Sequence, residues 1–217
     1  NTNGPEALAR GPEGDIYISS AQGWVLRHNP LTSATTRWVN TDGRPLGMVF
    51  DADQNLLVAD AYRGLLSIAP SGSVSVLTDS VEGSPIAYAD DVDVAADGKI
   101  YFSDASSKFG ARAHGGTYAA SLLDTMEHGG HGRVLVYDPA DHSTRVLLDG
   151  LNFANGIAVD ADSRFLLVAE TGHYRIKKYW LSGADRGTTD ILIDNLPGFP
   201  DNIVRAPNGR FWIGLVA

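Results

Sequence analysis

Short runs of alternating apolar and polar residues follow one another along the whole chain. Most of them are bounded by Gly, Pro, Asn or Asp, which is typical of β-strands joined by tight turns. A clear example is the segment 153–160, Phe-Ala-Asn-Gly-Ile-Ala-Val-Asp, which is followed after a turn by a second apolar run at 165–170. The pattern predicts an all-β protein built from short antiparallel strands.

This strand–turn–strand unit recurs, and its copies are in register. Glu6, Leu46, Asp90, Asn155 and Asp201 occupy the same place before the first strand of each copy, so the copies are 40, 44, 65 and 46 residues apart. A period of about 40–50 residues with four strands per copy is the signature of a β-propeller blade. The blades are expected to stack, because an isolated four-stranded sheet cannot bury both of its faces.

The spacing of 65 residues indicates an insertion at about 105–131. Within it, the segment from Thr117 to His128 has the pattern of a helix, with Thr117 as the expected cap, and glycine pairs flank it. We expect a single propeller domain over residues 1–217 that carries this helical, lid-like insertion. The alternative is a surface excursion with no function.

Composition and charge narrow the classes of function. The 217 residues carry a net charge of -9, which disfavours nucleic acid as a partner, and there is no cysteine for thiol or disulfide chemistry. No apolar run approaches the ~20 residues of a membrane helix. The chain does not begin with Met and has no visible signal peptide, so we expect it to come from a longer precursor. A small-molecule substrate is expected; compartment and oligomeric state stay open.

Several longer motifs resemble those of the strictosidine-synthase-like family. They are Gly43–Gly47 (GRPLG), Val58–Leu65 (VADAYRGL), Gly132–Pro139 (GRVLVYDP), Leu167–Thr171 (LVAET) and Leu196–Asn202 (LPGFPDN). That family belongs to a wider group with the gluconolactonases (regucalcin), the paraoxonases and the squid-type phosphotriesterase. The resemblance covers nearly the whole chain and implies a six-bladed β-propeller. Four blades and half of a fifth are present, so we expect the closing blade to be missing.

The repeated position before the first strands is the candidate site. First strands line the central channel of a propeller, so equivalent residues are expected to form a ring near one end of it. Carboxylate and amide oxygens suit Ca²⁺. Zn²⁺ is disfavoured, because the chain has no Cys and the ring has no His. The resemblance implies metal ligands at Glu6, Asn155, Asp201 and Asn202, while Asp90 stands where the wider group has Asn. We therefore expect Ca²⁺ to be held by these five residues.

Three hypotheses about function follow. The first is a Ca²⁺-dependent hydrolase of lactones or related esters, in which the metal polarises the carbonyl and Asp201 or Asp90 acts as base or nucleophile. The second is a strictosidine-synthase-like amine–aldehyde condensing enzyme, although the catalytic Glu of the plant enzyme lies in a later blade that this chain lacks. The third is a non-enzymatic propeller that binds a ligand, with Ca²⁺ in a structural role.

Histidine is the remaining candidate for acid or base chemistry. Leu46 stands where a paraoxonase-type site has a catalytic His. His114, His128 and His131 in the insertion are alternative acids or bases, and simple solvated loop histidines are the competing interpretation.

Overall fold

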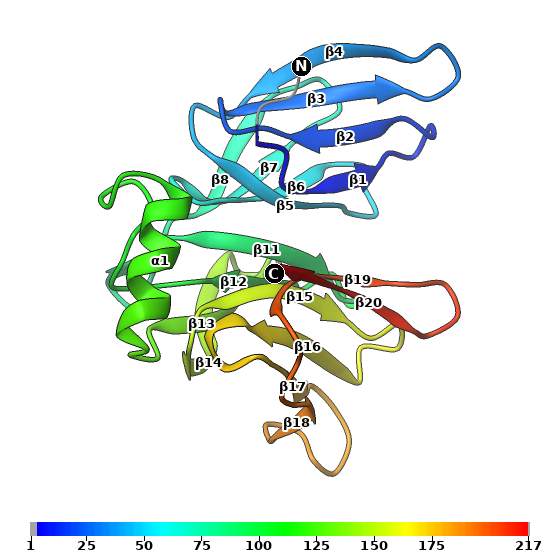
Figure 1. Cartoon of the computed structure of the whole chain (residues 1–217). Coiled ribbons are helices and arrows are strands. Elements are labelled where there is room, and N and C mark those ends of the chain that lie inside the picture. Colours follow the sequence, from blue (N-terminus) through cyan, green and yellow to red (C-terminus); the bar gives the residue numbers. More distant parts are fainter. Residues whose placement is uncertain (1–3, 217) are drawn as a thin grey trace.

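The computed structural model describes residues 4–216, and within them the chain forms four four-stranded and two two-stranded antiparallel sheets (Figure 1). The first blade contains β1 (Leu8–Arg10), β2 (Ile16–Ser19), β3 (Trp24–Asn29) and β4 (Ala34–Asn40). The second contains β5 (Pro45–Phe50), β6 (Leu56–Asp60), β7 (Gly64–Ile68) and β8 (Val74–Thr78). The short strands β9 (Ser80–Val81) and β10 (Ser84–Pro85) pair with each other before the third blade.

The third and fourth blades repeat this plan. The third contains β11 (Ala89–Val94), β12 (Ile100–Asp104), β13 (Gly132–Asp138) and β14 (Ser143–Leu151). The fourth contains β15 (Ala154–Val159), β16 (Phe165–Glu170), β17 (Arg175–Trp180) and β18 (Thr189–Ile193), with a 3₁₀ turn η1 (Thr171–His173) after β16. The last sheet has only β19 (Phe199–Arg205) and β20 (Phe211–Val216).

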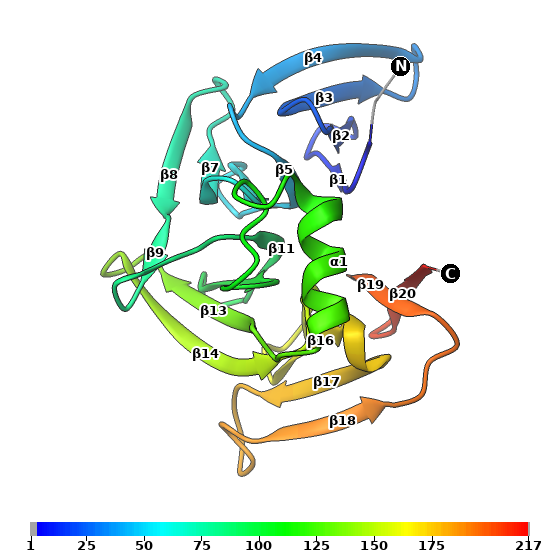
Figure 2. The same cartoon turned by 60° about the vertical axis from the view of Figure 1, so that its left-hand side comes forward.

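The strands of each sheet are hydrogen-bonded in chain order, so every blade is a simple antiparallel meander. The first strands β1, β5, β11, β15 and β19 neighbour one another in succession around a common centre (Figure 2). This arrangement confirms the predicted all-β propeller, of which the described residues supply four blades and half of a fifth.

The hydrophobic core lies between the blades, as stacking requires. One cluster joins Leu57 and Leu65 of the second blade to Phe102 of the third, and all three side chains are buried. Between the first two blades, the ring of Tyr17 meets Phe50 edge-on, with 5.0 Å between the ring centres. Aromatic pairs in this geometry add about 0.5–1.5 kcal/mol to the burial of their area. Neighbouring blades therefore stabilise one another through their faces.

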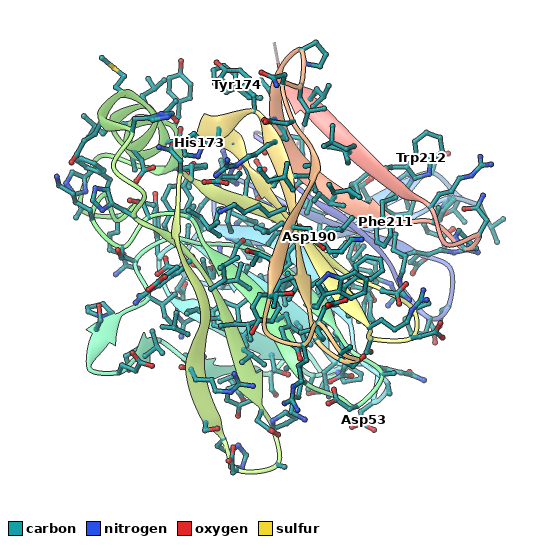
Figure 3. The ribbon with its side chains drawn as sticks, turned by 90° about the horizontal axis from the view of Figure 1, so that it is seen from below. Asp53, His173, Tyr174, Asp190, Phe211 and Trp212 are labelled. Carbon is teal, nitrogen blue, oxygen red and sulfur yellow. The ribbon has the colours of Figure 1, made fainter. Side chains whose placement is uncertain are left out.

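The last, two-stranded sheet buries only one of its faces. The ring of Phe211 in β20 packs against that of Phe165 in the fourth blade, with 6.1 Å between the ring centres. The next residue, Trp212, is 72% exposed (Figure 3). Adjacent residues of a strand point to opposite faces, which accounts for the difference.

The insertion between β12 and β13 carries one helix, α1 (Thr117–Glu127), at the end of the molecule where β11 begins (Figure 1). The predicted helix is confirmed, but the expectation that Thr117 caps it is wrong. The cap is Gly116, which makes no side-chain hydrogen bond and has a φ of 108°. Glycine adopts such a positive φ without the steric cost that a side chain would bring. No helix in residues 4–216 is long and apolar enough to cross a membrane.

Candidate functional site

A β-bulge interrupts the start of four blades at the repeated position. The register shifts between Pro45 and Met48, Ala89 and Val92, Ala154 and Ile157, and Pro200 and Ile203. Leu46, Asp90, Asn155 and Asp201 lie inside these bulges. A bulge turns a side chain out of the regular alternation and is frequent beside active sites. The sequence repeat therefore corresponds to a repeated irregularity of the backbone.

Two glycines next to these bulges let neighbouring first strands come close together. A Cβ on Gly156 would lie 2.5 Å from the backbone nitrogen of Ile203, and a Cβ on Gly47 would lie 2.5 Å from the Cα of Asp91. Neither position has room for a side chain. The ends of the first strands are therefore packed backbone against backbone at the candidate site.

The structure brings the predicted residues to one cavity of about 500 Å³. Its lining includes Glu6, Leu46, Asp90, Asn155 and Asp201, which we call the ring residues. Asn202, the fifth predicted metal ligand, is placed differently. It lines the adjoining cavity of about 460 Å³, and its Nδ2 donates to the backbone oxygen of Glu6 at 3.4 Å.

One oxygen in the ring has no donor. Asn155 donates through Nδ2 to Oδ1 of Asp201 at 2.7 Å, and this bond orients the amide. The Oδ1 of Asn155 is enclosed and has no hydrogen-bond partner among the described residues. A buried acceptor left without a partner costs about 1–3 kcal/mol. The ring therefore contains an enclosed carbonyl oxygen that could accept a ligand.

The carboxylates of the ring oppose one another's ionisation. Burial raises the pKa of Asp90 well above its ordinary value, and the charges of Glu6 and Asp201 raise it further. Burial and the charge of Asp201 likewise raise the pKa of Glu6. Burial also raises the pKa of Asp201, against the lowering effect of its bond from Asn155. A cation among these groups would relieve both the repulsion and the burial cost.

Asp91 and Asp93, the acidic residues of β11 that follow Asp90, bind backbone amides of the next blade. Asp91 accepts a hydrogen bond from the amide of Ile157 at 2.9 Å, and Asp93 accepts one from the amide of Val159 at 2.8 Å. These bonds tie β11 to the first strand of the next blade. Burial raises the pKa of Asp91 to about 7. Of the three aspartates in this stretch, only Asp90 lines the ring cavity.

A second set of acidic residues ends the second strands, and we call Asp60, Asp104 and Glu170 the clasp carboxylates. Each accepts a hydrogen bond from a backbone amide just before the first strand of its own blade: Arg44 at 2.9 Å, Tyr88 at 2.8 Å and Asn152 at 3.1 Å. The clasp carboxylates hold the segments that lead into the ring.

The most strongly paired clasp carboxylate is Glu170. Its oxygens lie 2.6 Å from Nε of Arg175, 2.7 Å from Nδ1 of His173 and 3.5 Å from Nζ of Lys177. Burial alone would raise the pKa of Glu170, but these donors outweigh burial and lower it to about 2. Glu170 is therefore a fixed anion.

The sequence pattern did not identify Arg44 and Tyr88 as residues of the candidate site. Arg44 and Tyr88 line the ring cavity, and each lies two residues before a ring residue. Arg44 donates to the backbone oxygen of Gly4 at 3.1 Å, and its Nη2 lies 3.9 Å from Oε2 of Glu6. Their shared place, two residues before the repeated position, is the sequence signal that could have identified Arg44 and Tyr88.

The histidines of the insertion lie away from the cavity. His114, His128 and His131 are not among the residues that line it. His128 instead packs against His173, with 4.6 Å between the ring centres, and Nε2 of His131 lies 3.3 Å from Oε1 of Glu127. Leu46 is buried in the apolar cluster below α1.

The donor chemistry of the ring fits a hard cation such as Ca²⁺. The ring offers carboxylate oxygens and the unpartnered amide oxygen of Asn155, and oxygen ligands of this kind suit Ca²⁺. No group of three or more His, Asp or Glu side chains within residues 4–216 is gathered closely enough to form a metal site by itself.

Comparison with known proteins identifies the family. The family model for strictosidine synthase matches residues 90–184, and the model for the strictosidine synthase-like N-terminal region matches residues 1–28. Strictosidine synthase-like protein 4 of Arabidopsis thaliana is 39% identical over 99% of this chain. The chain belongs to the strictosidine-synthase-like family. This chain covers 57% of that relative and 58% of the adipocyte plasma membrane-associated protein of Rattus norvegicus, which is 36% identical.

Solved structures with low sequence identity to this family member share its fold. A gluconolactonase from Xanthomonas campestris aligns with a TM-score of 0.81 at 22% identity, over 98% of this chain and 70% of its own. A calcium-binding regucalcin from Agrobacterium tumefaciens aligns with a TM-score of 0.73 at 15% identity, over 99% of this chain and 68% of its own. The chain thus has the propeller fold on which lactonases are built, and it spans little more than half the length of the strictosidine-synthase-like relatives above.

Proposed function

We propose that this propeller is a Ca²⁺-dependent hydrolase of lactones or related esters. The observation that carries the proposal is the unpartnered Oδ1 of Asn155, enclosed in a cavity with three carboxylates of raised pKa. The fold shared with a gluconolactonase and a calcium-binding regucalcin supports the same chemistry.

Glu6, Asp90, Asn155 and Asp201 are the residues that would hold the ion. Asn202 lies at the edge of this set, since it lines the adjoining cavity together with Glu6 and its side chain hydrogen-bonds to Glu6. When bound, Ca²⁺ supplies a Lewis acid that polarises a carbonyl oxygen. The carboxylates lose their mutual repulsion in its presence, which favours their ionised forms.

Asp90 and Asp201 divide the remaining tasks. The hydrogen bond from Asn155 holds Asp201 in one orientation, which suits a group that positions a reactant. Asp90 lines the same cavity and is not held by the bond from Asn155, which leaves its carboxylate to accept a proton. We assign Asp90 the role of accepting a proton from the attacking water and Asp201 the role of orienting it, with direct nucleophilic attack by Asp201 as the variant of this scheme.

The first test measures bound metal and melting temperature on the full-length protein, with and without chelator. We expect about one Ca²⁺ per chain and a stability gain of about 3 kcal/mol at a hundredfold excess of Ca²⁺ over its Kd. Hydrolysis of a lactone and ester panel should stop when the ion is removed.

Two buried asparagines give a matched pair of variants. Asn155 and Asn152 both have an enclosed oxygen without a partner among the described residues, but only Asn155 lines the ring cavity. Asn155→Ala should abolish the stabilisation by Ca²⁺, and Asn152→Ala should retain it. Absence of metal and of any chelator effect would overturn the proposal. Product formation from an amine and an aldehyde would then favour the condensing reaction to which the strictosidine synthase match points.

A further inference from the structure

The ring cavity has two chemically different walls. One wall is the ring, with its three carboxyl groups. The rest of the lining includes the aromatic and aliphatic residues Tyr118, Leu122, Phe153, Phe199 and Val216, beside Thr117, Ser121, Thr125 and Thr171. Helix α1 contributes no charged side chain to the lining. Of the helix hydroxyls that line the cavity, that of Ser121 is already used, since it donates to the backbone oxygen of Tyr118 at 2.8 Å.

Helix α1 presents a continuous apolar stripe beside this cavity. Tyr118, Leu122 and Met126 are 76%, 44% and 83% exposed, and they lie one turn apart along the helix. Tyr118 and Leu122 both line the cavity, so the stripe is an extension of its apolar wall. Exposed apolar surface that continues into a cavity is characteristic of binding sites.

The helix is a fixed wall because both of its ends are held. The hydroxyl of Tyr88 donates to the backbone oxygen of Thr117 at 2.9 Å, in the first turn. In the last turns, the carboxylate of Asp124 accepts a hydrogen bond from Ser106 at 2.5 Å. Ala120 between them is fully buried against the cluster that contains Leu46 and Phe153. The apolar stripe is thus set in place relative to the ring.

A cavity of about 500 Å³ lies in the range that small molecules fill. The ring suits the polar, reacting end of such a molecule. A sugar hydroxyl placed against Leu122 or Phe153 would lose its hydrogen bonds to water without replacement, at a cost of about 1–3 kcal/mol. An apolar group placed there would instead be favoured.

We propose that the substrate is an uncharged lactone or ester with an apolar substituent, which lies along the Tyr118–Leu122 face of α1 with the reacting group at the ring. This substrate class rests on the proposed hydrolase function, and it excludes polyhydroxylated sugar lactones as the preferred substrates.

The test separates binding from hydrolysis by using lactams, which imitate lactones but resist cleavage. Their affinity for the full-length protein is measured by calorimetry at saturating Ca²⁺, for a series with alkyl substituents of increasing length and for a polyhydroxylated lactam. We expect affinity to rise about two- to fourfold for each added methylene and the polyhydroxylated compound to bind most weakly.

The chain supplies a matched pair of variants for this series. Leu122 and Leu123 are 44% and 42% exposed on the same helix, but only Leu122 lines the cavity. Leu122→Asn should flatten the dependence on chain length, and Leu123→Asn should leave it intact.

Each outcome has one meaning. No dependence on chain length, no lactam binding, tighter binding of the polyhydroxylated lactam, or equal effects of the two variants would overturn the substrate class. A clear chain-length dependence without Ca²⁺-dependent hydrolysis of the matching lactones would uphold the apolar site and overturn the hydrolase function.

Discussion

The three acidic ring residues and the three clasp carboxylates are of the same residue types and lie at facing ends of paired strands, but their surroundings differ. Glu170 of the clasp is surrounded by donors and has a pKa lowered to about 2. Asp90 of the ring is surrounded by other carboxylates and has a raised pKa. The comparison teaches that three cationic or hydrogen-bonding partners outweigh burial at Glu170, whereas at Asp104 of the clasp burial still raises the pKa despite the partner Arg133.

The largest expected effect comes from breaking the clasp. Glu170→Gln leaves the charges of Arg175 and Lys177 without their buried partner, so the free energy of unfolding should fall by about 3–5 kcal/mol. Urea denaturation of the full-length protein measures this. Glu127→Gln, at an exposed carboxylate that pairs with Lys108, is the control and should have no measurable effect. Equal stability of the two variants would refute the structural role of Glu170.

Acid should change the contributions of Glu170 and of the ring carboxylates to stability in opposite directions. A folded-state pKa of about 2 for Glu170, against an ordinary 4.5, stabilises the fold by about 3 kcal/mol above pH 4.5, and this is lost as the pH falls towards 2. The ring carboxylates have raised pKa values, so without metal their contribution becomes less favourable as the pH rises above their ordinary values. The unfolding free energy of wild type, Glu170→Gln and Asp90→Asn, measured against pH in chelator, checks both signs.

The same carboxylate-to-amide change should have the opposite effect in the ring. Asp90→Asn removes a buried charge that two other carboxylates oppose, so the metal-free protein should gain about 1–2 kcal/mol of stability. Its affinity for Ca²⁺ should fall at least about tenfold, which corresponds to one lost charged ligand. Calorimetric titration and melting curves measure both. A variant that is less stable in chelator would show that the ring residue is structural after all.

The smallest effect is expected at Tyr88, which belongs to neither the ring nor the clasp but is bonded to a clasp carboxylate and lines the ring cavity. Tyr88 is held through its amide by Asp104 of the clasp and holds α1 through its hydroxyl. Tyr88→Phe keeps the amide bond and removes the hydroxyl bond, so stability should fall by about 1 kcal/mol. Calcium affinity should not change, because Tyr88 is not a ring residue. A large loss of calcium affinity would place the hydroxyl in the metal site instead.

Much of the fold could be predicted because the propeller repeats one local pattern. Regular spacing of Glu6, Asp90, Asn155 and Asp201 identified the blades, and in a closed arrangement of equivalent strands such spacing implies spatial proximity. Alternation of apolar and polar residues predicted the strands themselves.

The rest depends on contacts that no local pattern contains. The bulges that aim the ring side chains arise from pairing between strands, and they turn Asn202 towards a different cavity from Asp201. The cap of α1 is Gly116 rather than Thr117 because the entering chain adopts a positive φ. Arg44 and Tyr88 reach the cavity only because the clasp carboxylates fix the segments that carry them.

The close approach of the backbone at Gly156 also sets the aperture of the ring. With no side chain between them, Asn155 and Asp201 come from adjacent strands close enough for their side chains to bond directly. Any larger residue at this place would act as a spacer and push the two oxygen donors apart. Since ions are distinguished by their radius as well as by their charge, a glycine that touches no ligand would take part in determining which cation the proposed site selects.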